Sequence, residues 1–255
     1  RVSLNTRYNG AQVLDGSFSG KSLQVGTESG ESISFSIANI ESSELGAFVE
    51  EGLAKGAILG NIPPPNGTSV SDLTIAGKKS QVIDVELNDT AQEVAKKINA
   101  VAGGTQVTAE ARTFAHLYTT AAAPSGDQIN RRISFTDSAG NATATAAFTL
   151  TSNDVSDAVQ KINAISTTTG VQASATSDNK VLLTKQNGDD IRITNTSASA
   201  GDSAIKIRTV GIDGVAEAGS IIALAAAGSA NDAVTVKGNI RLTSDYDFTV
   251  TDHST

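Results

Sequence analysis

The chain contains no cysteine, methionine or tryptophan among its 255 residues. Without cysteine it can form no disulfide, no thiolate metal site and no cysteine nucleophile. Without methionine it has no initiator residue, so we expect a fragment or a processed product of a longer protein. Long apolar runs are absent too, since the longest candidate, residues 221–227, is far below the roughly 20 residues of a membrane span. No signal-peptide pattern opens the sequence.

Positive charge and aromatic side chains are scarce. The 19 Lys and Arg residues stand against 27 Asp and Glu residues, which gives a formal net charge of −8. Nucleic acids and anionic membrane surfaces require a basic face, so we expect neither as a partner. Aromatic residues make up only 4% of the chain, and large core anchors are therefore few. This composition favours several thin modules with many turns and short strands over one thick core.

The first recognisable pattern lies in residues 8–37. Two apolar runs alternate on either side of a glycine-rich turn at residues 26–30: Leu23 and Val25, then Ile33, Phe35 and Ile37. Such alternation around a glycine-rich turn is typical of an antiparallel hairpin with one buried face.

The same stretch carries an ordered set of motifs, namely Tyr8-Asn9-Gly10, Val13-Leu14-Asp15-Gly16, Phe18, Gln24-Val25-Gly26 and Gly30-Glu31-Ser32-Ile33. In this order and spacing they resemble the segment of bacterial flagellins that follows the long N-terminal helices. The resemblance implies a hairpin that lies nearest the surface between filament subunits. The hairpin residues it marks are Tyr8, Asn9, Gly10, Leu14, Asp15, Gly16, Gln24, Val25, Gly26, Ile33 and Phe35.

A β-β-α-β unit of roughly 60 residues occurs twice. The motif Lys97-Ile98-Asn99-Ala100 recurs 64 residues later as Lys161-Ile162-Asn163-Ala164, and Val107 recurs at the same offset as Val171. We expect each helix to cover a small sheet of its own unit.

In the first copy we expect strands at 73–75 and 83–87, a helix capped by Asp89 or Thr90 that ends near Gly103-Gly104, and a strand at 107–111. In the second copy we expect strands at 133–135 and 148–150, a helix capped by Asn153 or Asp154, and a strand at 171–175.

The first copy reads Asp89-Thr90-Ala91, Glu93-Val94-Ala95, Ile98-Asn99-Ala100 and Val107-Thr108-Ala109. This pattern is similar to the module with an Ile-Asn signature that is found in flagellins and hook-associated proteins. The second copy keeps Ala158-Val159, Ile162-Asn163-Ala164 and Val171. The resemblance marks the module core as Val94, Ile98, Asn99, Val159, Ile162 and Asn163.

The local sequence of several further segments predicts their secondary structure. Residues 41–55 predict a short helix or irregular structure, and the run of Pro63, Pro64, Pro65, Asn66 and Gly67 predicts a domain junction. Beyond the second copy we expect a hairpin of strands 181–183 and 191–193 around Gly188, a strand at 205–210, and an alanine-rich helix over 216–227. The runs 238–244 and 247–250 resemble the segment by which flagellins return from their outer domains.

We therefore predict an α+β, mainly β chain of small β-β-α-β modules and β-hairpins in an elongated multi-domain arrangement. The predicted segments are 1–40 as the hairpin remnant of the core-proximal domain, 41–66 as a connecting segment, 67–128 and 129–200 as the first and second repeat modules, 201–236 as a further outer-domain segment, and 237–255 as return strands toward the core-proximal domain.

Residues with catalytic or metal-binding chemistry are isolated. His116 and His253 stand far apart and form no His-Glu-x-x-His motif, so we expect His116 to be half-buried strand packing. The run Ser177-Asp178-Asn179-Lys180 fits Ser-x-x-Lys in letters only, because it lies between two strands. The runs 187–190 and 245–247 predict turns with solvated carboxylates rather than calcium loops. We predict no catalytic, metal or cofactor-binding residue and no enzyme.

The flagellin resemblance implies a secreted, extracellular structural subunit of the bacterial flagellar filament that acts in motility. Its implied partners are other flagellin subunits, and the chain by itself should be monomeric because the terminal helices that drive polymerisation are missing. Two alternatives stay open: a cell-surface adhesin or glycan-binding module, and a hook-associated protein. Contacts with glycans or host receptors are left unassigned.

Overall fold

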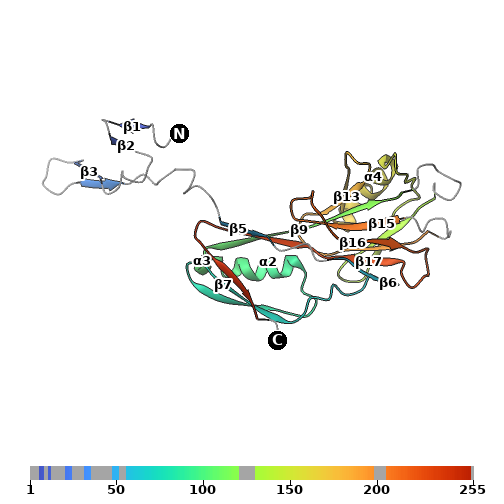
Figure 1. Cartoon of the computed structure of the whole chain (residues 1–255), viewed down its shortest axis with the longest axis horizontal. Helices are drawn as coiled ribbons and strands as arrows, with labels where there is room; N and C mark the ends of the chain where they lie inside the picture. The colour runs from blue at the N-terminus through green and yellow to red at the C-terminus, as the bar shows by residue number, and fades with distance from the viewer. Residues whose placement is uncertain are drawn as a thin grey trace. The chain divides into compact units, whose positions relative to one another are not determined.

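The computed structural model describes residues 6–8, 11–12, 21–24, 32–35, 48–51, 56–120, 130–197 and 205–253. The chain divides into two units, Arg1–Ala47 and Phe48–Thr255, and each is described by itself (Figure 1). Most of the described structure is antiparallel sheet with few helices, which confirms the predicted mainly β, α+β class.

The first unit contains two short antiparallel pairs. Strand β1 (Arg7–Tyr8) pairs with β2 (Ala11–Gln12), and β3 (Lys21–Gln24) pairs with β4 (Ser32–Phe35) in a register that sets Leu23 opposite Ile33. The predicted hairpin is therefore present. Its residues Tyr8, Gln24, Ile33 and Phe35 lie in these strands. The remaining hairpin residues lie outside the described part of the chain: Asn9, Gly10, Leu14, Asp15, Gly16, Val25 and Gly26.

The second unit holds three sheets, and every strand pair described in it is antiparallel. The five-stranded sheet has the order β11 (Ala142–Ala144), β10 (Ile133–Thr136), β14 (Ile191–Asn195), β17 (Ala233–Val236) and β6 (Ile58–Gly60). The seven-stranded sheet contains β12 (Gln172–Ala175), β13 (Val181–Lys185), β9 (Val107–Tyr118), β15 (Ile205–Val210), β16 (Glu217–Leu224), β18 (Asn239–Ser244) and β5 (Phe48–Glu51). The three-stranded sheet has the order β19 (Thr249–Asp252), β7 (Ser71–Ala76) and β8 (Ser80–Val85).

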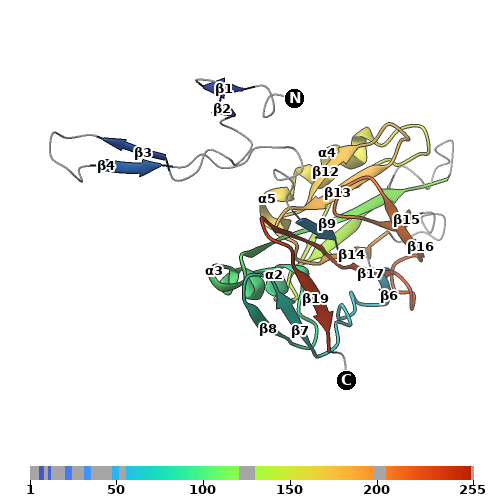
Figure 2. The ribbon, with the colours of Figure 1, turned by 60° about the vertical axis from the view of Figure 1, so that its left-hand side comes forward.

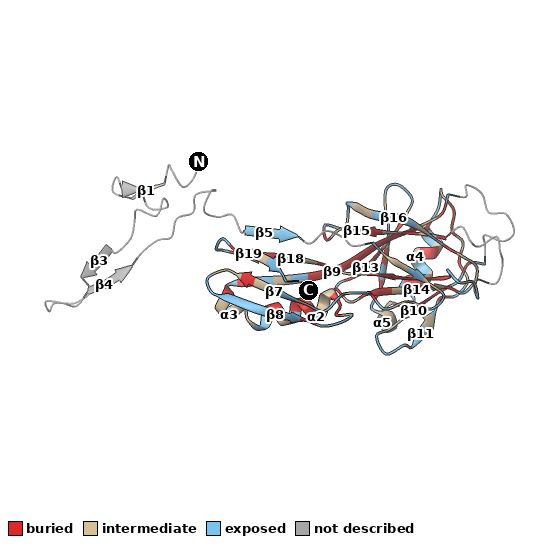
Figure 3. Cartoon of the chain, turned by 60° about the horizontal axis from the view of Figure 1, so that its bottom comes forward, coloured by how far each residue is buried: buried red, intermediate tan, exposed pale blue. Residues whose placement is uncertain are grey.

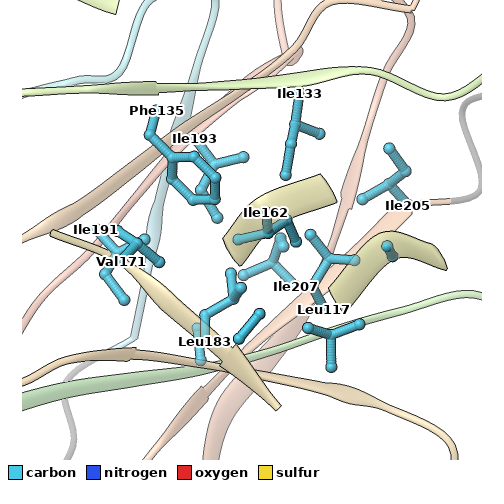
Figure 4. Packing of buried hydrophobic residues seen from close by; sticks show 14 of the residues in the cluster. Leu117, Ile133, Phe135, Ile162, Val171, Leu183, Ile191, Ile193, Ile205 and Ile207 are labelled. Atoms are coloured by element: carbon cyan, nitrogen blue, oxygen red, sulfur yellow. The ribbon is translucent and has the colours of Figure 1, made fainter. Parts of the chain in front are cut away.

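A larger hydrophobic core lies between the five-stranded and seven-stranded sheets. Helix α4 (Ser156–Asn163) packs into it, with short helix α5 (Ser166–Thr169) following. Strands that alternate buried and half-buried residues supply the walls, and Ile162 of α4 lies among them with no exposed surface (Figure 4). The labelled side chains around Ile162 are Leu117, Ile133, Phe135, Val171, Leu183, Ile191, Ile193, Ile205 and Ile207.

A smaller core surrounds helix α2 (Ala91–Ala100), which is followed by short helix α3 (Ala102–Thr105) (Figure 2). Val94 and Ile98 on the buried face of α2 pack with residues of the three-stranded sheet and of strands β9 and β18. The buried members of this core are Ile75, Ile83, Val85, Val94, Ile98, Val107, Leu242 and Phe248.

Strand β9 belongs to both cores. Its first half pairs with β18, and its second half pairs with β13 and β15. Val107 at its start is buried in the smaller core, and Leu117 near its end is buried in the larger one. Figure 3 shows β9 as largely buried where it enters the larger body of sheets. One continuous backbone therefore connects the two hydrophobic cores.

The two copies of the β-β-α-β unit do not each build a sheet of their own, which corrects the prediction. In the first copy the hairpin β7–β8 lies in the three-stranded sheet, whereas β9 lies in the seven-stranded sheet. In the second copy β10–β11 lies in the five-stranded sheet, whereas β12 again lies in the seven-stranded sheet. Strand β13 pairs antiparallel with both β9 and β12, so the final strands of the two copies run parallel on either side of it.

Strands β13 and β14 do not form the predicted hairpin around Gly188. Strand β13 pairs with β12 and β9, whereas β14 pairs with β10 and β17 of the other sheet. The turn between them crosses from one sheet to the other, and the Gly188 carbonyl accepts a hydrogen bond of 3.1 Å from the Gln92 amide of α2. Local alternation indicated the strands but did not specify their partners.

In the second copy the partner of β10 is β11, not the predicted strand at 148–150. Phe148 forms only an isolated bridge with Arg131, and Leu150 is not in a strand. Both side chains are fully buried in the larger core. Their apolar alternation reflects burial in that core rather than membership of a strand ladder.

Two segments, one predicted as helix and one as short helix or irregular structure, contain strands. The alanine-rich segment 216–227 contains strand β16, which pairs with β15 and has Gly219 in the left-handed region with φ of +70°. Within segment 41–55, residues 48–51 form β5, which pairs with the edge of β18. In both places an available strand edge outweighs intrinsic helix propensity, which is a weak preference. The predicted return runs form β18 and β19, which complete the sheets around α2.

We predict that Gly188→Ala is much more destabilising than Gly140→Ala. Both glycines have positive φ, +75° and +88°, so each substitution incurs about 1 kcal/mol of backbone strain. A Cβ on Gly140 meets open space, whereas one on Gly188 overlaps Ala111 of β9. We expect a total loss of about 3 kcal/mol or more at Gly188 in urea unfolding. Equal losses of stability at the two positions would contradict the predicted overlap of a Cβ at Gly188 with Ala111.

Candidate functional site

The Ile-Asn signature builds the same connection in both copies. In the first copy the Asn99 side-chain amide donates to the Ala109 carbonyl and accepts from the Ala109 amide, both at 2.8 Å. In the second copy Asn163 makes the same pair of bonds with Ala173, again both at 2.8 Å. We call this paired contact the amide clamp. It ties the end of each helix to the strand that follows it.

The amide clamp occupies a strand edge. Strand β12 ends its sheet, and the first half of β9 pairs with β18 on one side only among the described strands. The side chains of Asn99 and Asn163 therefore satisfy backbone groups on edges that lack a strand partner. Unpaired edges are templates for aggregation, and a side chain that occupies them prevents such pairing.

A threonine completes the connection in each copy. Thr105 Oγ1 donates to the Val101 carbonyl at 3.3 Å and accepts from the Val107 amide at 3.2 Å. Thr169 makes the equivalent bonds to Ile165 and Val171, at 3.1 and 3.2 Å. We did not single out these threonines from the sequence, although their spacing of 64 residues matches the repeat.

The residue after each threonine takes the left-handed conformation that ends the short helix. In the first copy this is Gln106 with φ of +59°, and in the second it is Gly170 with φ of +69°. Glycine adopts this region without a steric penalty, whereas glutamine does not. The second copy therefore forms this turn with less backbone strain than the first.

The helix starts differ between copies. Thr90 caps α2 as predicted and forms a capping box with Glu93. The N-cap of α4 is Val155, with no side-chain cap, which corrects the predicted Asn153 or Asp154. Asp154 lies one residue earlier, where its Oδ1 accepts from the Ser156 amide at 2.8 Å.

The other predicted core residues lie where the repeat places them. Val94 and Ile98 are buried on α2, and Ile162 is buried on α4. Val159 is half-buried and packs against the larger core. The structure therefore places these residues on the inner helix faces, while the two signature asparagines bind backbone rather than packing in the core.

A buried polar group lies at the turn between β13 and β14. Asp190 is 2% exposed, and its Oδ2 accepts from Asn66 Nδ2 at 3.1 Å. Asn66 is itself 1% exposed and also donates to the backbone carbonyls of Asn88 and Asp89. Arg192 approaches Asp190 Oδ2 at 3.5 Å. Asp190 is thus not a solvated turn residue, which corrects the prediction for run 187–190.

Burial raises the pKa of Asp190 to about 6, against the hydrogen bond from Asn66 and the charge of Arg192, which lower it. Asn66 and Asp190 are 124 residues apart, so no local sequence signal could have paired them.

His116 and Lys180 of the run 177–180 both lie beside the carboxylate of Glu217. His116 is 6% exposed, more buried than predicted, and its Nδ1 lies 2.7 Å from Glu217 Oε1. Glu217 also pairs with Lys180 and Arg208, and the hydrogen bond from Lys180 lowers its pKa most. The run 177–180 is a turn between β12 and β13, as predicted.

Among the residues that the structure describes, no group of three or more His, Asp or Glu residues is arranged to hold a metal ion. Within the same ranges no helix has the length and apolarity to cross a bilayer.

A family model described as the flagellin hook IN motif matches residues 72–122, which include β7, β8, α2 and β9. Flagellin A of Helicobacter pylori is 27% identical over 224 residues, covering 83% of this chain and 40% of the relative. Flagellin B of Vibrio anguillarum is 31% identical over 109 residues, covering 40% of this chain and 28% of the relative. Residues 72–122 thus match a flagellin motif, and most of the chain is similar in sequence to a flagellin.

The chain spans less than half the length of these two curated relatives. Among solved structures, it is similar to the crystal structure of the flagellar cap protein FliD from Helicobacter pylori. That likeness has a TM-score of 0.26 at 11% identity and covers 64% of this chain and 58% of the other.

We predict that Asn163→Ala and Asn99→Ala each lower the free energy of unfolding, by about 1–2 kcal/mol, because each removes two hydrogen bonds. The loss should be larger at Asn163, whose bonds are partly buried, than at Asn99, whose bonds are exposed. Urea unfolding measures both, with the exposed Lys96→Ala as a surface control. Light scattering should also show more self-association of the alanine variants, since each opens a strand edge. Losses no larger than that of Lys96→Ala would show that the clamps do not stabilise the fold.

We predict a pH-dependent effect for Asp190→Asn. The pKa of Asp190 in the folded state, about 6, lies above the ordinary aspartate value of 3.8. The folded state therefore binds its proton more tightly, and this stabilisation is lost as pH rises from about 4 through about 6. Relative to the wild type, Asp190→Asn should gain about 2–3 kcal/mol between pH 4 and pH 7. Urea unfolding at each pH measures this, with the exposed Asp84→Asn as a charge control. A constant difference across this range would contradict the prediction.

Proposed function

We propose that this chain is part of a structural subunit of the bacterial flagellar filament, in which it forms outer domains exposed to the medium. It is exported to the cell exterior with the rest of the subunit and acts in motility as a structural element, without catalysis. The observation that carries this proposal is the similarity to Flagellin A of Helicobacter pylori across 83% of the chain.

The fold supports a mechanical role. A single strand, β9, passes through both hydrophobic cores, and β18 pairs with it along its first half. Hydrogen-bonded backbone that is shared in this way resists bending between the two parts better than a linker does. A unit exposed on a rotating filament has to withstand shear, and such a connection suits that demand.

The partners that follow from this role are other flagellin subunits. Contacts between successive subunits in one repeated orientation build open helical assemblies. We propose that residues 1–40 lie nearest those contacts and that the modules at 67–128 and 129–200 face solvent. The formal net charge of −8 argues against binding to nucleic acids or anionic membranes.

An antibody raised against residues 48–255 tests the proposal on the bacterium that encodes the chain. Immunogold electron microscopy should place label along the whole length of each filament, because every subunit carries the epitope. A strain that lacks the gene provides the control for antibody specificity.

Other labelling patterns would contradict the filament role. Label confined to the filament tip or to the junction with the hook would indicate a hook-associated protein. Label on the cell body without filaments would indicate a surface adhesin, and a glycan array would then identify its sugar.

A further inference from the structure

The chain contains three Asn-Gly dipeptides, at residues 9–10, 66–67 and 187–188, and the second and third lie within the described residues. An asparagine deamidates most readily when glycine follows it, because glycine has no Cβ to shield the backbone nitrogen that attacks the side chain. The structure places the two described dipeptides in opposite environments, so it distinguishes between them.

Both asparagines form the same local turn. Oδ1 of Asn187 accepts a hydrogen bond of 3.2 Å from the Asp189 amide, and Oδ1 of Asn66 accepts one of 2.9 Å from the Thr68 amide. Each bond spans the glycine peptide and folds the side chain back over the backbone. It also polarises the side-chain carbonyl, because the donor lies at the oxygen on which negative charge develops during attack. The two sites therefore share the features that favour ring closure.

Asn66 is held in this turn by its other contacts. It is 1% exposed, and its Nδ2 donates to the carbonyls of Asn88 and Asp89 and to Asp190 Oδ2. The Gly67 amide, which supplies the attacking nitrogen, donates to Asn88 Oδ1 at 3.1 Å. Ring closure at Asn66 therefore has to break four hydrogen bonds in a site that excludes water.

Asn187 lacks these restraints on its side chain. It is exposed in the turn that follows β13, and its Nδ2 has no hydrogen-bond partner among the described residues. The Gly188 amide makes one bond, to the Lys185 carbonyl, with a long separation of 3.3 Å. The leaving group is therefore open to water, and one weak hydrogen bond has to break before the nitrogen attacks.

We propose that Asn187 is a site of spontaneous deamidation in the folded chain, whereas Asn66 is protected. The Gly188 nitrogen attacks Asn187 Cγ, the bond from Cγ to Nδ2 breaks, and Nδ2 leaves as ammonia with the proton of the Gly188 amide. The cyclic imide that results takes up a water molecule, which opens either of its two carbonyl–nitrogen bonds. The products are aspartate or isoaspartate at this position. This modification site goes beyond the filament role and does not depend on it.

The isoaspartate product changes a turn that has little room. It adds a carbon atom to the backbone directly before Gly188, where a Cβ would already overlap Ala111 of β9. The Gly188 carbonyl also accepts the hydrogen bond from the Gln92 amide that joins this turn to α2. We therefore expect deamidation at Asn187 to lower the stability of the second unit.

Peptide mapping by mass spectrometry of the aged, full 255-residue chain tests the proposal. The folded chain is incubated at mildly alkaline pH and digested at acidic pH, and the acid form of each Asn-Gly peptide is quantified over time. We expect Asn187 to deamidate more than about tenfold faster than Asn66, because only Asn66 first has to lose four hydrogen bonds. Equal rates in the folded chain, or an unmodified Asn187, would overturn the proposal.

The same incubation in guanidinium chloride separates the fold from the local sequence. The rates at Asn187 and Asn66 should converge there, because glycine follows both asparagines and the contacts of the folded chain are gone. A difference as large in denaturant as in the folded chain would overturn the structural explanation.

Asn187→Gln is the matched variant, because glutamine keeps the side-chain amide and closes a ring much more slowly. Urea unfolding compares fresh and aged samples of each protein, and labelling by an isoaspartyl methyltransferase measures the isoaspartate. Ageing should lower the unfolding midpoint and add label in the wild type, and should do so less in Asn187→Gln. Equal changes in the two proteins would overturn the assignment of the effect to Asn187.

Discussion

The second unit of this chain depends on one strand. Strand β9 is 12 residues long, about twice the usual length. Its first half closes the core around α2, and its second half lies in the middle of the larger sheet. Each core therefore orients the other through backbone hydrogen bonds, and neither half of the duplicated sequence is an independent body. This shared strand is the feature most relevant to the structural role that we propose.

Between the two copies, the connection from the helix to the following strand is preserved more closely than the start of the helix. The clamps of Asn99 and Asn163 have the same partners at the same distances, and the threonine bonds recur as well. The capping box of α2 has no equivalent at α4. This difference has a physical basis, because a strand edge must be occupied wherever no strand is available, whereas a helix start can be held by packing alone.

The smaller core is filled almost entirely by aliphatic residues. Its buried residues are aliphatic except for Phe248, in keeping with the small number of aromatic residues in the chain. The turn between β13 and β14 is polar instead. Asn66 satisfies three acceptors at that point, and Asp190 retains an oxygen without a donor.

The sequence by itself determined the duplicated unit, the cap and inner face of α2, most strands and the similarity to flagellins, because these depend on local periodicity and on spacing. It did not determine which strands pair. The alternation of β13 and β14 is compatible with a hairpin, yet the two strands lie in different sheets. The alanine-rich β16 is a strand because β15 offers it an edge. The buried Asp190 binds Asn66, which is 124 residues away in the sequence. Strand pairing and burial at a junction arise from long-range contacts, whose energies exceed the local preferences that a sequence pattern records.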